Sequence, residues 1–281
     1  MSPTKIGRIA IGTQTLLARI DGEAAIPLLV DGGEPWADPL RMWLASERIE
    51  ERGAVVALGG GRLLAPVRAP SKVVAIGLNY RDHAEEQGKA LPQAPMLFNK
   101  SPGSIVGPGD EVVFRTSDSD QVDYEGELAV VIGRTTKDVG VDQALDQVLG
   151  YTICNDISAR DAQESDRQYF RAKSFDTFCP LGPWITLAES IPDPQSLRIV
   201  TRVNDEVRQD CTTAQMIFGV ADIVSYVSRY MTLEPGDVLT TGTPGGVGVG
   251  MSPPVFLKDG DVLEVEIEGI GVLQNCVRTS D

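Results

Sequence analysis

The amino-acid sequence predicts a mainly β, α+β fold in two parts, and three observations support this prediction. Short runs with strand-like alternation outnumber the stretches with helical spacing. The two kinds of segment do not alternate regularly, which disfavours a doubly wound parallel sheet. The strongest break in the chain combines Gly59–Gly61 with the Pro66 and Pro70 pair, and glycine and proline mark such boundaries. We therefore expect a small β-rich N-terminal domain over residues 1–65 and a larger domain over residues 70–281.

The expected elements follow from local pattern. In the N-terminal part, strand-like runs lie at Arg8–Ile11, Thr15–Ile20 and Ala25–Val30, and an amphipathic stretch lies at Arg41–Arg48. After the break, the apolar run at Lys72–Gly77 predicts a buried strand, and the polar segment Asn79–Gln87 before Gly88 predicts a short helix with a glycine cap.

Two more helices and a hairpin are expected towards the C-terminus. Apolar residues recur with helical spacing over 141–149 and again over 223–230. Residues 255–257 and 263–267 flank a polar turn, and the second run alternates apolar residues with glutamates. This pattern predicts a β-hairpin with one wet face.

Composition and charge exclude several classes of partner. The 281 residues include 40 acidic and 25 basic ones, for a net charge of −15, so long-range electrostatics would repel nucleic acid and anionic lipid. No apolar run approaches the roughly 18 residues of a membrane span, and no signal-peptide core follows the N-terminus. The four cysteines form no Cys-x-x-Cys pair. We expect a cytoplasmic protein that binds neither nucleic acid nor membrane.

Three acidic side chains, Glu125, Glu127 and Asp156, are the candidate metal ligands. If residues 124–132 form a strand, its period of two places both glutamates on one face, and both faces are apolar further along. Burying unpaired carboxylates costs several kcal/mol, and no Lys or Arg lies between Gln121 and Gly133. A hard divalent cation would compensate the charge. The sequence therefore predicts a Mg²⁺ or Mn²⁺ site.

His83 is the only histidine in the chain. On a helix, Glu86 lies on the same face, so its carboxylate could orient the imidazole and raise its basicity. The pair would then form a general base. The alternative is a surface histidine in an acidic helix.

Further candidates come from two segments. Arg160, Gln163 and Lys173 follow closely on Asp156 and could supply a local positive field, although such cations are often surface ion pairs. The glycine-rich run 241–250 is followed by two prolines instead of a helix, which argues against a phosphate loop. It could offer backbone N–H groups and the Thr243 hydroxyl to a ligand, or simply connect two elements.

Together these segments resemble the fumarylacetoacetate hydrolase family, over about residues 72–277. The resemblance rests on several motifs in the family's order, namely Gly77–His83, Asp123–Leu128, Asn155–Asp161, Lys173–Thr177, and Pro235–Asp237 with Thr241–Pro244. It implies a mixed β-sandwich roll, a homodimer, and residues 1–65 packed as a small domain on the catalytic one.

The resemblance also implies roles for individual residues. The metal, Mg²⁺ or Mn²⁺, would be held by the three carboxylates, and His83 with Glu86 would be a water-activating dyad. Lys173 would serve as the oxyanion or proton-transfer residue. The substrate would be bound by Tyr80, Arg160, Gln163 and Thr243. Phe98–Pro102 departs from the Lys-Pro usual in the family, which puts the role of Lys100 in doubt.

The resulting hypothesis is a divalent-metal-dependent hydrolase that cleaves a C–C bond of an acylpyruvate-type 1,3-dicarbonyl acid through an enolate. Because the same enolate arises in other reactions, an oxaloacetate-type decarboxylase and an oxo-acid isomerase or tautomerase are alternatives. The dyad favours hydrolysis, since hydrolysis needs a base for water. A non-catalytic protein stabilised by its metal is a further alternative. Arg167, Tyr169 and Phe170 could form the wall around the distal half of the substrate.

Overall fold

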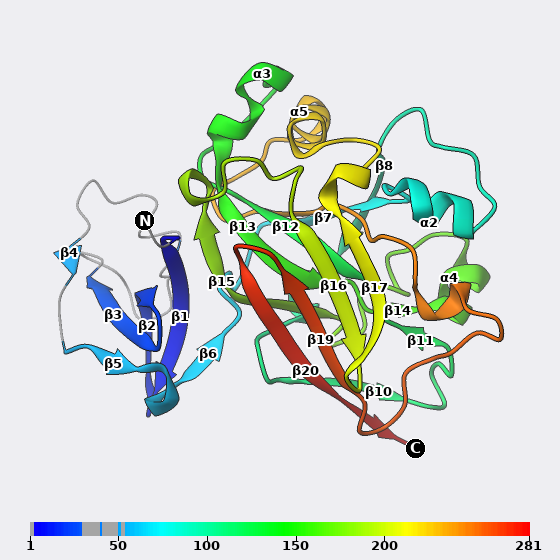
Figure 1. Ribbon diagram of the computed structural model, residues 1–281, viewed down its shortest axis with the longest axis horizontal. Helices are drawn as coiled ribbons and strands as arrows, with labels where there is room; N and C mark the ends of the chain where they lie inside the picture. The colour runs from blue at the N-terminus through cyan, green and yellow to red at the C-terminus, as the bar shows by residue number, and fades with distance from the viewer. Residues whose placement is uncertain (1–2, 30–39, 41–49, 52–53) are drawn as a thin grey trace.

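The computed structural model describes residues 3–29, 40, 50–51 and 54–281. It confirms the predicted class, because the chain is built mainly of strands in mixed sheets, with few and short helices (Figure 1). No helix among the described residues is long and apolar enough to cross a lipid bilayer.

The elements have the following bounds. The strands are β1 (Lys5–Ile11), β2 (Gln14–Asp21), β3 (Ala24–Leu29), β4 (Glu50–Glu51), β5 (Val56–Ala57), β6 (Arg62–Leu64), β7 (Val73–Gly77), β8 (Met96–Lys100), β9 (Ile105–Val106), β10 (Glu111–Arg115), β11 (Val122–Asp123), β12 (Gly126–Ile132), β13 (Val148–Asn155), β14 (Ser158–Ala159), β15 (Cys179–Leu187), β16 (Arg198–Val203), β17 (Glu206–Thr212), β18 (Val238–Thr240), β19 (Val262–Ile267) and β20 (Gly271–Ser280). The α-helices are α2 (Arg81–Glu86), α3 (Val141–Ala144), α4 (Arg160–Asp166) and α5 (Val220–Tyr230), and short 3-10 turns lie at Leu58–Gly60, Pro102–Ser104, Leu145–Gln147, Ala188–Ser190, Thr213–Gln215 and Gly248–Gly250.

Two sheets form the body of the molecule. The larger has the strand order β4-β3-β2-β1-β15-β13-β12-β18-β7-β8, and the smaller has the order β10-β20-β19-β16-β17. In Figure 1 the smaller sheet lies in front of β12 and β13, and α5 lies above both. Apolar side chains from β12, β13, β16, β19, β20 and α5 meet in one core cluster between these layers.

The central strand β12 is buried along its whole length. Leu128 and Val130 face the smaller sheet and α5, whereas Ala129 and Val131 pack on the opposite side with β7, β15 and β18. The predicted alternation over this strand is therefore confirmed. The strand begins at Gly126, so Glu125 lies just before it.

The N-terminal strands gather at the left of Figure 1. The three strands expected there correspond to β1, β2 and β3 as far as Leu29, while the amphipathic stretch Arg41–Arg48 lies outside the described residues. Strand β1 joins β15 through only two residue pairs, Lys5 with Thr186 and Ile6 with Ile185.

Two local predictions need correction. Residues 255–257 form no strand, because Leu257 is held by a single backbone bond to Val122, and the hairpin instead pairs β19 with β20. The helical spacing over 141–149 yields only α3 and a 3-10 turn before β13 begins at Val148.

Candidate active site

Sheet register brings the three predicted metal ligands together. Strand β13 pairs with β12 so that Cys154 lies opposite Glu127, and the backbone N–H of Asp156 donates to the carbonyl of Glu125 at 2.8 Å. One carboxylate oxygen from each of Glu125, Glu127 and Asp156 lies within 4.8 Å of the others, and all three residues are buried. Residues far apart in sequence thus present three carboxylates to one point.

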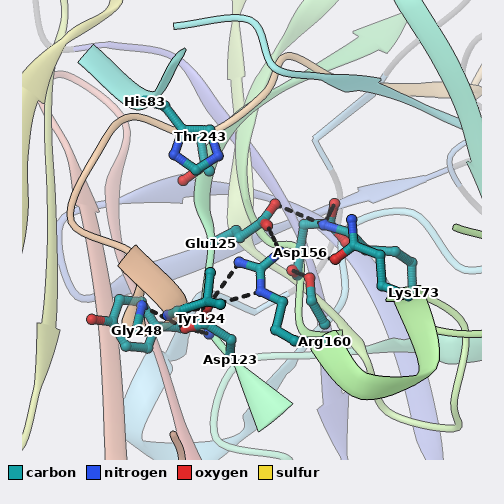
Figure 2. A network of polar contacts seen from close by, with 12 residues as sticks. His83, Asp123, Tyr124, Glu125, Asp156, Arg160, Lys173, Thr243 and Gly248 are labelled. Carbon is teal, nitrogen blue, oxygen red and sulfur yellow. Dashed lines mark hydrogen bonds and ion pairs between the residues drawn. The ribbon is translucent and has the colours of Figure 1, made fainter. Parts of the chain in front are cut away.

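Three buried cations surround these carboxylates. Lys173 Nζ lies 2.7 Å from Glu125 and 2.9 Å from Asp156, and Lys100 also forms an ion pair with Asp156. Arg160 lies 2.6 Å from Glu125 (Figure 2). The argument that no cation is at hand is therefore corrected, because cations distant in sequence reach the site through the fold.

These charges shift the pKa values of Glu125 and Glu127 in opposite directions. Burial raises the pKa of Glu125, but Lys173 and Arg160 outweigh burial and lower it to about 2. Burial and then the carboxylates of Asp156 and Glu125 raise the pKa of Glu127 well above its ordinary value. Glu127 accepts a 2.8 Å hydrogen bond from the Gly242 N–H, and among the described residues it has no ion-pair partner. Glu127 is thus the carboxylate most in need of a counter-charge.

The donor set fits a hard divalent cation. Four buried carboxylates (Asp123, Glu125, Glu127 and Asp156) face three buried cations (Lys100, Arg160 and Lys173), so one carboxylate, Glu127, has no counter-charge when it is ionised. Mg²⁺ and Mn²⁺ take oxygen ligands and retain open positions for water or substrate. Glu125, Glu127 and Asp156 would hold such an ion.

His83 lies in a chain of hydrogen bonds that fixes its tautomer. Lys89 donates to the side-chain oxygen of Gln87, because an ammonium group can only donate. The Gln87 amide nitrogen must then face His83 Nε2, at 2.7 Å, and donate to it. The ring proton therefore sits on Nδ1, which donates to Glu86 at 3.2 Å. The predicted contact between His83 and Glu86 is present, and Nε2 is the basic atom.

The glycine-rich loop 241–250 binds carboxylates of the protein itself. The N–H of Gly246 donates to Glu86 at 3.0 Å, and those of Gly248 and Val249 donate to Asp123 at 2.8 and 3.0 Å. Asp123 also accepts a 2.9 Å bond from Arg160 Nε (Figure 2). These N–H groups of the loop therefore position Glu86 of the dyad and, through Asp123, Arg160, and they are not available to a ligand.

Thr243 is also engaged by the protein. Its hydroxyl donates to the Gly126 carbonyl at 2.9 Å and accepts from Gln209 at 2.8 Å. A hydroxyl has one proton and two lone pairs, so a single acceptor position remains for a substrate.

A cavity of about 290 Å³ is lined by some of these groups, while Glu86, Glu127 and Asp156 lie outside its lining. Its lining includes the predicted residues His83, Glu125, Arg160, Gln163, Lys173 and Thr243, together with Ile76, Gly77, Leu78, Gln87, Lys89, Met96, Phe98 and Tyr169. Tyr80 does not line it: the side chain is fully buried in the core cluster, and its hydroxyl has no hydrogen-bond partner among the described residues. That position argues against direct contact between Tyr80 and a substrate.

The three residues expected to form a wall around the distal half of the substrate, Arg167, Tyr169 and Phe170, do not all line the cavity. Tyr169 lines the cavity and makes an edge contact with Phe98. Arg167 and Phe170 line an adjoining groove that shares Met96, Phe98 and Tyr169 with the cavity.

Asp123, Gln87 and Lys89 belong to the site but carried no assigned role in the sequence. A search for charge partners along the chain could not find the first, because Arg160 is 37 residues away. Gln87 follows His83 by four residues, about one helical turn, so its spacing was a usable signal, whereas Lys89 lies beyond the end of the helix.

The cluster of three buried carboxylates could hold a metal ion, and with the adjacent histidine and lysine it has the composition of an enzyme active site. Residues 72–278 match the model of the fumarylacetoacetate (FAA) hydrolase C-terminal family, and the chain belongs to this family.

Similar proteins narrow the comparison. The chain is 45% identical to an oxaloacetate tautomerase of Bacillus subtilis (strain 168), over 86% of this chain and 81% of that protein. It is 50% identical to a mitochondrial oxaloacetate tautomerase of Homo sapiens, over 76% of this chain and 68% of that protein. Among solved structures, a 2-hydroxyhepta-2,4-diene-1,7-dioate isomerase from Mycobacterium marinum superposes with a TM-score of 0.82 at 41% identity, covering 99% of both chains.

Proposed function

We propose that this protein is a divalent-cation-dependent tautomerase that interconverts the keto and enol forms of a 2-oxo dicarboxylic acid such as oxaloacetate. The two relatives named as oxaloacetate tautomerases support this assignment, as does the similar structure named as an isomerase. They favour the tautomerase alternative over the C–C hydrolase that the sequence motifs suggested first.

The observation that carries the proposal is that His83, with its Nδ1 beside Glu86, lines the same cavity as Lys173. Keto–enol interconversion needs a base for a proton on carbon and a positive field for the charge that develops on the neighbouring oxygen. It needs no water nucleophile. Both requirements are met by side chains that line one cavity.

A divalent cation bound by Glu125, Glu127 and Asp156 would supply Lewis-acid stabilisation of the 2-oxo group. Towards the enol, His83 Nε2 takes a proton from the carbon next to the 2-oxo group, and Glu86 stabilises the imidazolium through Nδ1–H. The Lys173 ammonium lies among carboxylates that raise its pKa against the lowering effect of burial, so it remains charged and stabilises the oxygen. The Lys173 ammonium then gives a proton to that oxygen, which forms the enol O–H, and proton exchange with solvent resets both side chains. In reverse, Lys173 takes the hydroxyl proton and His83 returns a proton to carbon. In the substrate, no bond other than C–H and O–H changes.

The test uses freshly dissolved enol-oxaloacetate, followed by the loss of enol absorbance, with NMR of the products in parallel. Purified protein with Mg²⁺ or Mn²⁺ should speed the conversion to the keto form without releasing pyruvate, and EDTA should abolish the effect. Rapid formation of pyruvate and carbon dioxide would instead make this a decarboxylase. Pyruvate and a carboxylic acid from an acylpyruvate, with no effect on enol-oxaloacetate, would restore the hydrolase.

The homodimer and the cytoplasmic location implied by the sequence stay predictions. Sedimentation equilibrium of the purified chain tests the first, and fractionation of cells that express it tests the second.

A further inference from the structure

One cation in the cavity lining has no carboxylate partner among the residues that the structure describes. Arg160, Lys173 and Lys89 are the three basic residues in its lining. Arg160 and Lys173 are committed to buried carboxylates. Among the described residues, Lys89 contacts no carboxylate, and its ammonium touches only the Gln87 side-chain oxygen. An unpaired cation at the wall of a site for an acidic molecule is the natural receptor for a second anionic group.

The backbone fixes where Lys89 lies relative to the base. After α2 ends, Gly88 takes a left-handed conformation with φ of +61°, which turns the chain back on the helix. The N–H of Lys89 then donates to the Ala84 carbonyl at 2.9 Å. Lys89 is thereby tied to the helix that carries His83.

We infer that Lys89 recognises the distal carboxylate of a dicarboxylic substrate, and that Gln87 couples this recognition to the base. This inference rests on the proposed function and names the structural basis of its substrate class. In the free protein, Gln87 joins Lys89 to His83 and covers Nε2. A carboxylate that takes the Lys89 ammonium removes one of the two bonds that hold the Gln87 amide, so the amide can leave Nε2. The base is then free when a diacid is bound.

Arg167 provides a matched comparison. It has no ion-pair partner among the described residues and lines the adjoining groove, outside the wall that contains His83. If the distal carboxylate of a four-carbon diacid were bound in the adjoining groove instead of the cavity, Arg167 would be its receptor. The two basic residues therefore make competing and separable predictions.

The experiment compares Lys89→Met, Lys89→Arg and Arg167→Met with two enols, those of oxaloacetate and of the monocarboxylic phenylpyruvate. Lys89→Met should lower the ratio of kcat/KM for oxaloacetate to kcat/KM for phenylpyruvate about tenfold, equivalent to about 1.4 kcal/mol. Lys89→Arg should retain most of the oxaloacetate activity. An equal loss with both substrates, or a loss for oxaloacetate in Arg167→Met alone, would overturn the inference.

Coupling through Gln87 is tested by a double-mutant cycle. If Gln87 links the two groups, Lys89→Met should cost more oxaloacetate activity in a Gln87→Leu background than in the wild type, because in that background the substrate displaces no amide from the ammonium. Additive effects would refute the coupling.

Equilibrium titration keeps the inference separate from the proposed function. Oxaloacetate and 2-oxobutanoate have the same chain length and differ in the distal carboxylate. If the wild-type protein speeds the conversion of neither the oxaloacetate enol nor the phenylpyruvate enol, the proposed tautomerase activity is refuted. A selective loss of oxaloacetate affinity in Lys89→Met, measured with Mg²⁺ present, would still support carboxylate recognition, whereas unchanged affinities would reject it.

Discussion

Replacing Lys100 by methionine tests the role of the buried cations. The Lys100 side chain is fully buried, and its ammonium contacts the Asp156 carboxylate and the carbonyls of Lys173 and Ile157. Removing one partner of a buried ion pair typically costs about 3–5 kcal/mol. Because Lys173 still contacts Asp156 at 2.9 Å, we expect the lower end, about 3 kcal/mol of unfolding free energy.

The metal should reduce this loss. A cation bound at Asp156 supplies part of the positive charge that the substitution removes, so the stability gap between the variant and the wild type should narrow with Mn²⁺. By linkage, the variant should bind the cation more tightly than the wild type. Urea unfolding followed by tryptophan fluorescence, in EDTA and in Mn²⁺, measures both quantities.

Lys72→Met is the matched control. Lys72 pairs with the buried Asp237, but its side chain is 23% exposed, and Asp237 also accepts bonds from Ser71 and Glu234. Its loss should cost about 1 kcal/mol or less and should not respond to metal. A gap below about 1 kcal/mol for Lys100→Met in EDTA, or a gap unchanged by Mn²⁺, would refute the reasoning.

Three further outcomes are expected. His83→Ala should lower the enol conversion rate by about 10² to 10⁴-fold and leave Mn²⁺ affinity unchanged, as titration calorimetry can check. Since the pKa of Glu127 is raised, the metal-free site holds a proton that a cation must displace. The affinity of the site for Mn²⁺ should therefore rise with pH and level off above that pKa. Titration calorimetry in buffers of different ionisation enthalpy would detect the released proton, because the binding enthalpy would depend on the buffer. Asp123→Asn weakens the contacts to Arg160 and the loop at Gly248, so kcat should fall while far-UV circular dichroism is retained; an unchanged kcat would argue against this positioning role.

Features set by local pattern could be predicted from the sequence. The alternation along β12 determines its two buried faces, and the spacing of three residues brings His83 and Glu86 together on one helix. Both depend on backbone periodicity alone, which is visible in a short window.

Features that depend on long-range pairing could not be predicted in the same way. Lys100 lies at the end of β8 and contacts Asp156, 56 residues away. The strands β7, β18 and β12 lie between β8 and β13 in the sheet, so neither spacing along the chain nor pairing of neighbouring strands predicts this contact. The motif resemblance placed Tyr80 at the substrate, but its side chain points into the core instead of the cavity. Residues 255–257 are apolar enough for a strand, yet among the described residues they make isolated backbone bonds, such as that from Leu257 to Val122, instead of a ladder.

The narrow junction between β1 and β15 has a consequence for solubility. An unpaired strand edge offers free N–H and C=O groups to other chains and promotes aggregation. The pairs at Lys5 and Ile6 occupy part of the β15 edge, and β6 and β2 in turn flank β1. The N-terminal strands therefore cover the β15 edge of the sheet that carries the site. A chain shortened to residues 72–278 would keep every catalytic side chain but expose this strand edge, and it should aggregate more readily.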